Sequence, residues 1–241
     1  MTPDPSKLLE RLGITLPLIG FYDAPDAAGF EPVVTPEPSR HVCVFSFFRD
    51  WLEGRTLLIT SENFGCGGAG TALFSLQTRT REEYVTFLAE TEGLKCSREV
   101  MGAWLDARRT YRPVNECILI GPLREGKGRF LRSVTFHVNP DQLSALVIGA
   151  HYCSVPGDPP AVLAPFGSGC MELITPFADL AVPQAVIGAT DIAMRRYLPP
   201  DILAFSVTVP MFEQLCALDE RSFLCKPFLK NLQKARAREK Q

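Results

Sequence analysis

Short apolar runs and helically spaced apolar residues follow one another along the whole chain. Apolar runs bounded by Gly, Pro and polar residues indicate strands, whereas apolar residues three and four positions apart indicate helices. Strands are predicted at 16–22, 56–60, 116–120, 131–138, 161–165, 185–187 and 203–209. Helices are predicted at 8–12, 39–52, 71–76, 139–152, 191–197, after Thr80 and Ser97, near Cys170, and from 220 onwards. No long stretch holds strands alone, so we expect a mixed α/β (α+β) fold with strands and helices interleaved.

Three helix starts have recognisable capping signals. Asn139 stands directly before a proline, which combines an N-cap residue with proline in the first turn. Thr80 and Glu83 have the spacing of a capping box, and Ser97 with Val100 has the weaker form that lacks the acid. We therefore expect these three helix boundaries to be well defined.

Two pairs of segments resemble each other within the chain. Residues 135–146 and 204–215 both indicate a strand, a proline and a helix. Residues 57–70 and 161–170 both indicate a strand, a glycine loop with a cysteine, and a helix. Either the chain contains two similar βα halves, or common βα units resemble each other by chance. The sequence leaves both explanations open.

Composition predicts one globular domain over residues 1–241. Apolar residues make up 46% and charged residues 22%, and a chain of 241 residues can bury a substantial core. Within it, residues 1–40 are expected to form an N-terminal strand and a proline-rich connection, and residues 226–241 a basic helical tail. A homo-oligomer is compatible with this composition.

Charge and hydropathy exclude several classes of partner. Lys and Arg number 25 against 27 Asp and Glu, so the chain lacks the basic excess of a nucleic-acid-binding domain. It starts without the apolar segment of a signal peptide, and no run of about 18 apolar residues indicates a membrane span. We therefore expect a cytoplasmic protein with neither nucleic-acid nor membrane partners. In that reducing compartment the eight cysteines are expected to be thiols, metal ligands or redox groups.

Two glycine-rich segments resemble nucleotide-binding motifs but lack an essential part. Residues 65–70 match G-x-G-x-x-G, yet the region about 20 residues further on reads as helix, where a second strand should end in an acid. Residues 121–128 resemble a P-loop but have glycine where Ser or Thr should bind magnesium. For the second segment we expect a β-hairpin turn with a solvated Lys127.

Cys66 and Cys170 provide the strongest chemical signal. Each is predicted to follow a strand, lie among glycines and precede a helix. Glycines allow close approach of the backbone to a bound group, and a helix N-terminus lowers the pKa of a cysteine. The resulting thiolate binds soft metals or attacks electrophiles. Alternatively, both cysteines are small, inert residues at crowded turns.

At these residues the chain resembles the family known as domain of unknown function 169. The resemblance spans residues 15–218, and the family has no assigned biochemistry. It favours cysteine at three positions, Cys43, Cys66 and Cys170. The matching pieces are Arg40-x-x-Cys43, Cys66-Gly-Gly-Ala-Gly70, Gly121-Pro-Leu, Gly169-Cys170-Met-Glu172, Gly188-x-x-Asp191-x-x-x-Arg195 and Phe205-Ser-Val-x-Val-Pro210.

The resemblance implies that three thiols from three segments meet at one site. Such a site would suit an iron–sulfur cluster with an open coordination position, or zinc with one exchangeable ligand. The metal candidates are Cys43, Cys66 and Cys170, and the ligand-binding candidates are Gly67, Gly68, Gly169, Glu172, Asp191 and Arg195. The chain departs from the family at 44–48, where Val-Phe-Ser-Phe-Phe replaces an alanine-rich helix. A narrower or differently filled pocket would follow.

Simpler roles exist for the polar candidates. Glu172 could be a first-turn helix acid and Asp191 an N-cap, and Arg195 could face solvent rather than an anion. The three histidines, at positions 41, 137 and 151, are expected at the surface or satisfied in the core.

Three hypotheses for the function follow. The first is a metal- or iron–sulfur-binding protein, with a redox-related role and a metal or small-molecule ligand. The second is a thiol-dependent enzyme or small-anion-binding domain that uses Cys66 or Cys170 at a helix N-terminus. The third is a non-catalytic interaction domain in which the glycines only permit tight packing.

Overall fold

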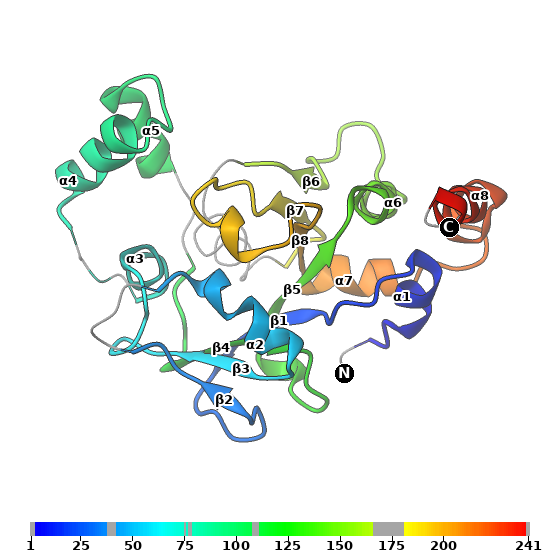
Figure 1. Cartoon of the computed structure of the whole chain (residues 1–241), viewed down its shortest axis with the longest axis horizontal. Helices are drawn as coiled ribbons and strands as arrows, with labels where there is room; N and C mark the ends of the chain where they lie inside the picture. Colours follow the sequence, from blue (N-terminus) through cyan, green and yellow to red (C-terminus); the bar gives the residue numbers. More distant parts are fainter. Residues whose placement is uncertain are drawn as a thin grey trace.

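One mixed sheet organises the chain. The computed structural model describes residues 3–37, 42–74, 76, 79–107, 111–165 and 181–239. Within this part, eight strands are arranged in the order β2-β3-β4-β1-β5-β8-β7-β6, flanked by helices (Figure 1). The strands are β1 (Ile19–Ala24), β2 (Val33–Val34), β3 (Thr56–Ile59), β4 (Cys117–Pro122), β5 (Leu131–Val138), β6 (Val162–Leu163), β7 (Ala185–Gly188) and β8 (Leu203–Thr208). The predicted mixed α/β fold is confirmed.

Helix boundaries follow the capping signals. The helices are α1 (Ser6–Leu12), α2 (Phe48–Leu52), α3 (Gly67–Phe74), α4 (Arg81–Thr86), α5 (Arg98–Ala107), α6 (Pro140–Ala150), α7 (Val209–Cys216) and α8 (Pro227–Glu239). The side chain of Asn139 accepts a hydrogen bond from the backbone N–H of Gln142 at 3.0 Å, within a reciprocal capping box. Thr80 and Glu83 form the same arrangement at α4. At α5 the backbone N–H of Val100 donates to Ser97 Oγ at 3.2 Å, so all three predicted caps are confirmed.

The sheet consists of two similar halves. In β1–β4 the order is 2-3-4-1, and in β5–β8 it is 6-7-8-5. In each half one pair, β2 with β3 and β6 with β7, is parallel and the other neighbours are antiparallel. The two halves meet at the antiparallel pair of β1 and β5. A pseudo-two-fold axis between these central strands therefore relates the halves.

Strand register supports the same relationship in detail. Aligning Val-Val-Thr-Pro at 33–36 with Val-Leu-Ala-Pro at 162–165 superimposes the registers of both halves. The pair Leu57–Ile120 then corresponds to Val186–Ser206, and Asp23–Ile118 to His137–Ala204. The similar sequence segments had paired β6 with β3 and β8 with β5. The sheet instead shows that β6 corresponds to β2 and that β8 corresponds to β4.

Helices cover both faces of the sheet. On one face α1, α6 and α7 pack against alternate strand residues, including Phe136 and Phe205. On the other face lie α2, α3 and residues 189–198, around Phe45 and Trp51. A 3-10 segment, η1 (Val44–Phe47), leads into α2 on this second face. The candidate residues Cys43 and Cys66 belong to this second core.

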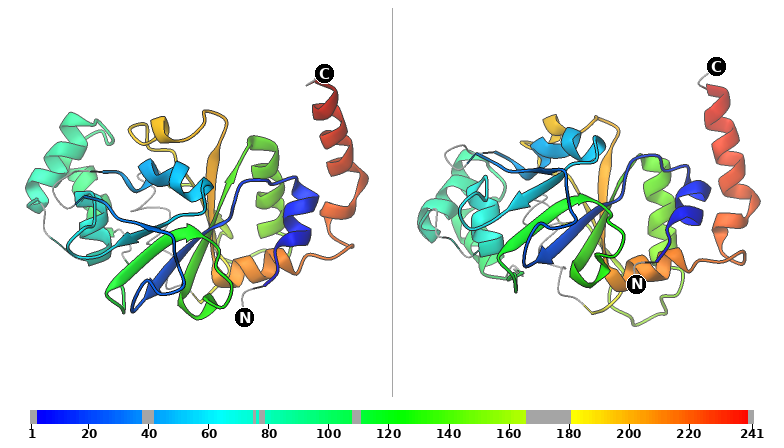
Figure 2. Two further views of the ribbon diagram at one scale, coloured as in Figure 1. Left: turned by 60° about the horizontal axis from the view of Figure 1, so that its bottom comes forward. Right: turned by 90° about the horizontal axis from the view of Figure 1, so that it is seen from below.

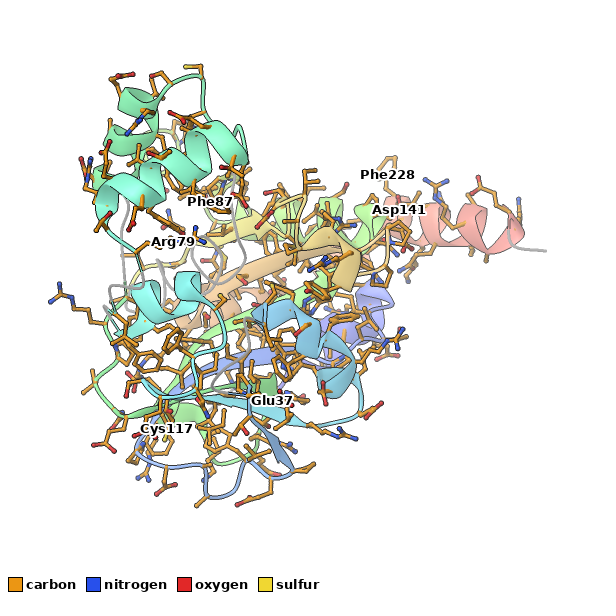
Figure 3. The ribbon with its side chains drawn as sticks, turned by 60° about the vertical axis from the view of Figure 1, so that its left-hand side comes forward. Glu37, Arg79, Phe87, Cys117, Asp141 and Phe228 are labelled. Atoms are coloured by element: carbon orange, nitrogen blue, oxygen red, sulfur yellow. The ribbon has the colours of Figure 1, made fainter. Side chains whose placement is uncertain are left out.

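A helical hairpin interrupts the first half. It comprises α4, the π-helical turn η2 (Phe87–Thr91) and α5, and it has a small core of its own built on Val85, Leu88 and Met101. Figure 3 shows the hairpin projecting from the sheet, with Arg79 and Phe87 at its base. The corresponding connection of the second half, between β7 and β8, contains only residues 189–202. The hairpin is therefore an insertion into one of two similar halves.

Three local predictions were wrong. The helix expected at 39–52 begins only at Val44, and as a 3-10 turn, because Cys43 is extended with φ −66° and ψ 139°. Residues 191–197 contain a 3-10 turn at Arg195–Tyr197 and no α-helix. Residues 121–128 are no hairpin turn, since β1 separates β4 from β5. Lys127 is anchored there, because its Nζ donates to the carbonyl of Ala28 at 2.5 Å.

None of the described helices is long and apolar enough to cross a membrane.

Candidate functional site

A backbone hydrogen bond brings two of the predicted cysteines together. The N–H of Val42 donates to the carbonyl oxygen of Gly65 at 3.2 Å, so the residues that follow, Cys43 and Cys66, lie in adjacent segments. Gly65 has φ +76°, and a Cβ atom there would lie 2.9 Å from the Val42 oxygen. A side chain at this position would thus be strained and would push the two segments apart. We call Cys43 and Cys66 the thiol pair.

Asp191 reaches the thiol pair from the second half. Its carboxylate and the Cys66 thiol both raise the pKa of Cys43, which places both groups within electrostatic reach of that sulfur. Asp191 follows β7 after Ala189, a buried residue with φ +63° and the only non-glycine residue with positive φ in the described chain. This conformation is costly for alanine, so surrounding contacts hold the chain in it.

Asp191 also has the structural role considered from sequence. Its Oδ1 accepts a hydrogen bond from Ala193 N at 2.8 Å, and its carbonyl accepts from Met194 N at 3.2 Å. It therefore caps the turn at 192–197 while lying near the thiols.

Cys43 is a neutral thiol in the metal-free protein. Burial is the main cause that raises its pKa to about 11, and the nearby Cys66 and Asp191 act in the same direction. The backbone N–H groups of Phe45 and Ser46 oppose this change by stabilising the thiolate. Near neutral pH Cys43 lacks the thiolate character of a reactive nucleophile.

The remaining predicted residues fall into three groups. Gly67 and Gly68 form the first turn of α3 directly after Cys66, whereas the sequence predicted a loop there and a helix only from residue 71. Arg195 is committed to its own loop, where its guanidinium donates to the carbonyls of Ile202, Pro199 and Pro200 at 2.5, 3.0 and 2.9 Å. The other predicted residues, Gly169, Cys170 and Glu172, lie outside the described residues.

Glu92 of the hairpin lies within electrostatic reach of Asp191, and neither Glu92 nor the neighbouring Arg79 had a signal in the sequence. The pKa of Glu92 is raised by burial and by Asp191, and Arg79 lowers it. The guanidinium of Arg79 lies 4.4 Å from the ring centroid of Phe87, at the base of the hairpin. Glu92 is one of many exposed acids on the hairpin, so only the fold distinguishes it. The insertion therefore adds charge to one side of the site.

The sheet beneath this face differs between the two halves. Strands β5 and β8 place buried hydroxyls at three positions where β1 and β4 of the first half have large apolar residues. The hydroxyl residues are Ser133, Thr135 and Ser206, and their counterparts are Ile19, Phe21 and Ile120. Thr135 and Ser206 hydrogen-bond to each other. The second half thus contributes a polar floor, and the first half an apolar one.

His137 lies on the same face and is fully buried among aromatic rings. Its ring centroid is 4.9 Å from that of Phe48 and 6.0 Å from that of Trp51. Burial lowers its pKa to about 4, and its Nε2 has no hydrogen-bond partner in the described structure. The sequence predicted a surface or satisfied core histidine, and the structure shows a neutral core histidine with one free nitrogen.

The donor set fits a metal only in part. Two sulfurs and one carboxylate oxygen suit a soft or borderline cation. Within the described ranges, however, no three His, Cys, Asp or Glu residues are grouped closely enough to hold a metal ion. A metal at the thiol pair would therefore need at least one ligand beyond the geometry described here.

Comparison with known proteins assigns the chain to a family. The family model DUF169, described as uncharacterised ArCR, matches residues 7–217. No curated protein and no solved structure matches the chain. The match covers most of the chain, including both halves of the sheet and the thiol pair. The chain belongs to the DUF169 family.

Proposed function

We propose that this protein binds a metal ion or an iron–sulfur cluster at the thiol pair. The observation that carries the proposal is the approach of the segments of Cys43 and Cys66 through the Val42–Gly65 hydrogen bond, with Asp191 within electrostatic reach of Cys43. These residues come from three separate connections of the chain, so the fold rather than local sequence brings them together.

A cation would relieve an electrostatic cost of this arrangement. Cys66 and Asp191 each disfavour the thiolate form of Cys43, because like charges would then lie close together in a buried setting. A bound cation reverses that effect and deprotonates a coordinating thiol. Groups that repel one another when ionised are thus mutually compatible once a metal is present.

Cys170 is the expected source of a further ligand. In the sequence it follows Pro165 of the second half, as Cys43 follows the corresponding Pro36 of the first half. Three thiolates with one exchangeable position would suit zinc or an iron–sulfur cluster. Asp191 would then stabilise the bound cation through its negative charge. A metal held this way would supply Lewis-acid or electron-transfer chemistry.

The thiol-enzyme alternative rests on Cys66 or Cys170. Cys43 is not a candidate nucleophile, because its raised pKa opposes a substantial thiolate population. Anion binding by Arg195 is also disfavoured, because three backbone carbonyls already occupy its guanidinium. We therefore prefer the metal-binding function.

Cobalt titration of the metal-free protein tests the proposal. Co²⁺ bound through thiolates gives a sulfur-to-metal charge-transfer absorption, so we expect saturable binding of one ion per chain or less. Cys43→Ser and Cys66→Ser should each abolish the band, and Cys170→Ser should weaken or abolish it. Cys153→Ser is the matched control, since Cys153 is exposed on the surface. Absence of the band in the wild type, or an unchanged band in Cys43→Ser, would contradict the proposal.

A further inference from the structure

The face of the sheet that carries the thiol pair changes composition from one half to the other. In the first half, large apolar side chains fill five inward positions: Ile19, Phe21, Ile59, Ile118 and Ile120. Strand register places smaller residues at the matching positions of the second half: Ser133, Thr135, Gly188, Ala204 and Ser206. Every exchange removes side-chain atoms, and three exchanges introduce a hydroxyl. We call Ser133, Thr135, His137, Ala204 and Ser206 the polar floor.

The polar floor is buried, yet some of its polar atoms have no partner. Ser133 is 1% exposed and His137 is 2% exposed. In the described structure neither Ser133 Oγ nor His137 Nε2 has a hydrogen-bond partner. Trp51 Nε1 is equally unpartnered, and the Trp51 ring lies beside that of His137. Buried polar groups are normally paired, so these atoms require partners that the described chain does not supply.

Most of the unused hydrogen-bonding capacity belongs to donors. The indole Nε1 of Trp51 can only donate, and the hydroxyl of Ser133 carries one hydrogen. Thr135 and Ser206 hydrogen-bond to each other, so one hydroxyl of this pair keeps its hydrogen for a further acceptor. A ligand with several acceptor atoms would therefore complement this face.

The polar floor contains no charged side chain. Burial lowers the pKa of His137 to about 4, so its imidazole is neutral near pH 7. Arg132, which precedes Ser133, is already used: it donates to the Tyr111 hydroxyl at 3.2 Å and to the carbonyl of Arg129 at 3.3 Å. A charged ligand buried here would lack a partner of opposite charge, which is costly. The composition of the floor thus favours an uncharged ligand.

Aromatic rings border the polar floor at His137. The ring centroids of Phe45, Phe48 and Trp51 lie 6.4, 4.9 and 6.0 Å from that of His137. Helix α2, which carries Phe48 and Trp51, lies on the opposite side of the sheet from α7 (Figure 2). Ser133 and His137 are four residues apart in an extended strand, which corresponds to about 13 Å. A flat molecule of fused rings has a suitable length, and aromatic side chains pack well on its faces.

We propose that the polar floor binds an uncharged, planar heterocycle that carries carbonyl oxygens. The unpartnered donors supply hydrogen bonds to its acceptors, and the smaller side chains of the second half supply the space. A mainly apolar surface with a few placed polar groups is typical of small-molecule sites. No cysteine belongs to the polar floor, so this site is independent of the proposed metal site.

Lumiflavin, an uncharged heterocycle of three fused rings with carbonyl groups, is the probe for this site. In a Trp104→Phe background Trp51 is the only remaining tryptophan, and lumiflavin should quench its fluorescence saturably. Ser133→Ala should weaken binding about fivefold through the loss of one buried hydrogen bond. Ser144→Ala, at an exposed position of α6, is the matched control and should bind as the parent does. Cys43→Ser should also bind lumiflavin unchanged.

Restoring a residue of the first half distinguishes a ligand site from a core that the chain itself fills. Ser133→Ile introduces the side chain found at the matching Ile19 and removes a hydroxyl that has no partner. We expect its melting temperature to equal or exceed that of the parent and its lumiflavin binding to be lost. A melting temperature several degrees lower would show that the chain already occupies this space and would overturn the proposal. Unchanged Trp51 fluorescence on addition of lumiflavin, or equal affinities in Ser133→Ala and Ser144→Ala, would also overturn it.

Discussion

The backbone N–H of Val42 donates to the carbonyl oxygen of Gly65 over 3.2 Å and thereby ties two connections of the first half together. Cys43 and Cys66, each one residue further along, enter the same core as a result. The bond is possible because Gly65 adopts φ +76° without a side chain. A single backbone contact thus determines whether the proposed metal ligands are neighbours.

Replacing Gly65 by alanine should disrupt this contact. Gly65→Ala adds a Cβ atom 2.9 Å from the Val42 oxygen at a residue with positive φ, so both strain and a clash follow. We expect a loss of unfolding free energy of about 2–4 kcal/mol together with weaker cobalt binding. The control is Gly126→Ala, where φ is +72° but nothing lies within 4 Å of the new atom. It should cost only about 1 kcal/mol in urea denaturation. Equal costs at both sites would refute the role of the Val42–Gly65 contact.

His137 should make the protein sensitive to acid. Its pKa in the folded state is about 4, below the ordinary 6.5, so the folded protein binds fewer protons than the unfolded chain. Its contribution to stability is therefore complete above pH 6.5 and is lost as the pH falls towards 4. His137→Leu should remove about 3 kcal/mol of this pH dependence, measured by denaturation at several pH values. His151→Ala, at an exposed position, should retain it. An unchanged pH profile in His137→Leu would show that this histidine does not titrate as described.

Asp23 should be essential for anchoring the segment that connects the helical hairpin to β4. Its buried carboxylate accepts hydrogen bonds from the Tyr111 hydroxyl, from Val114 N at 2.7 Å, and from Asn115 N at 2.9 Å. Asp23→Asn replaces one accepting oxygen by a donor and leaves buried donors unpaired, at a cost of about 2–4 kcal/mol. Asp158→Asn is the matched control. Its carboxylate also accepts a backbone N–H, from Val155 at 2.8 Å, but at the surface. A similar small loss in both variants would contradict the importance of burial.

Arg195 should affect stability without affecting metal binding. Arg195→Gln removes donors to the carbonyls of Ile202, Pro199 and Pro200, so the melting temperature should fall by several degrees. The cobalt absorption should keep its intensity at saturation. Arg196→Gln, which changes an exposed residue, should leave both quantities near the wild-type values. Loss of the cobalt band in folded Arg195→Gln would instead assign this arginine to the site.

Local signals in the sequence predicted local structure well. Asn139 and Thr80 were recognised as caps because the capping box is a short-range pattern, and both caps are present. The segment before Phe48 was predicted as helix because its aromatic residues recur at helical spacing. That spacing does not reveal that Cys43 is extended, which depends on its contact with the segment of Gly65.

The long-range arrangement was less accessible. Correspondence of the halves rests on strand register, and the matching Val-Val-Thr-Pro and Val-Leu-Ala-Pro segments are too short to be recognised without it. Cys43 and Cys66 were candidates because of the family pattern, but their proximity to Asp191 arises from connections that cross the face of the sheet. Arg195 shows a different limit of the sequence analysis. Its guanidinium is occupied by backbone carbonyls of its own loop, and the sequence alone does not distinguish such an arginine from one that is available to bind an anion.

The most direct test of the proposed metal site is elemental analysis and a visible spectrum of the wild-type protein purified without air. We predict stoichiometric zinc, or iron and sulfide with broad visible absorption, and loss of either in Cys43→Ser and Cys66→Ser but not in Cys153→Ser. A colourless, metal-free protein in which Cys43 and Cys66 are both freely alkylated would contradict the account.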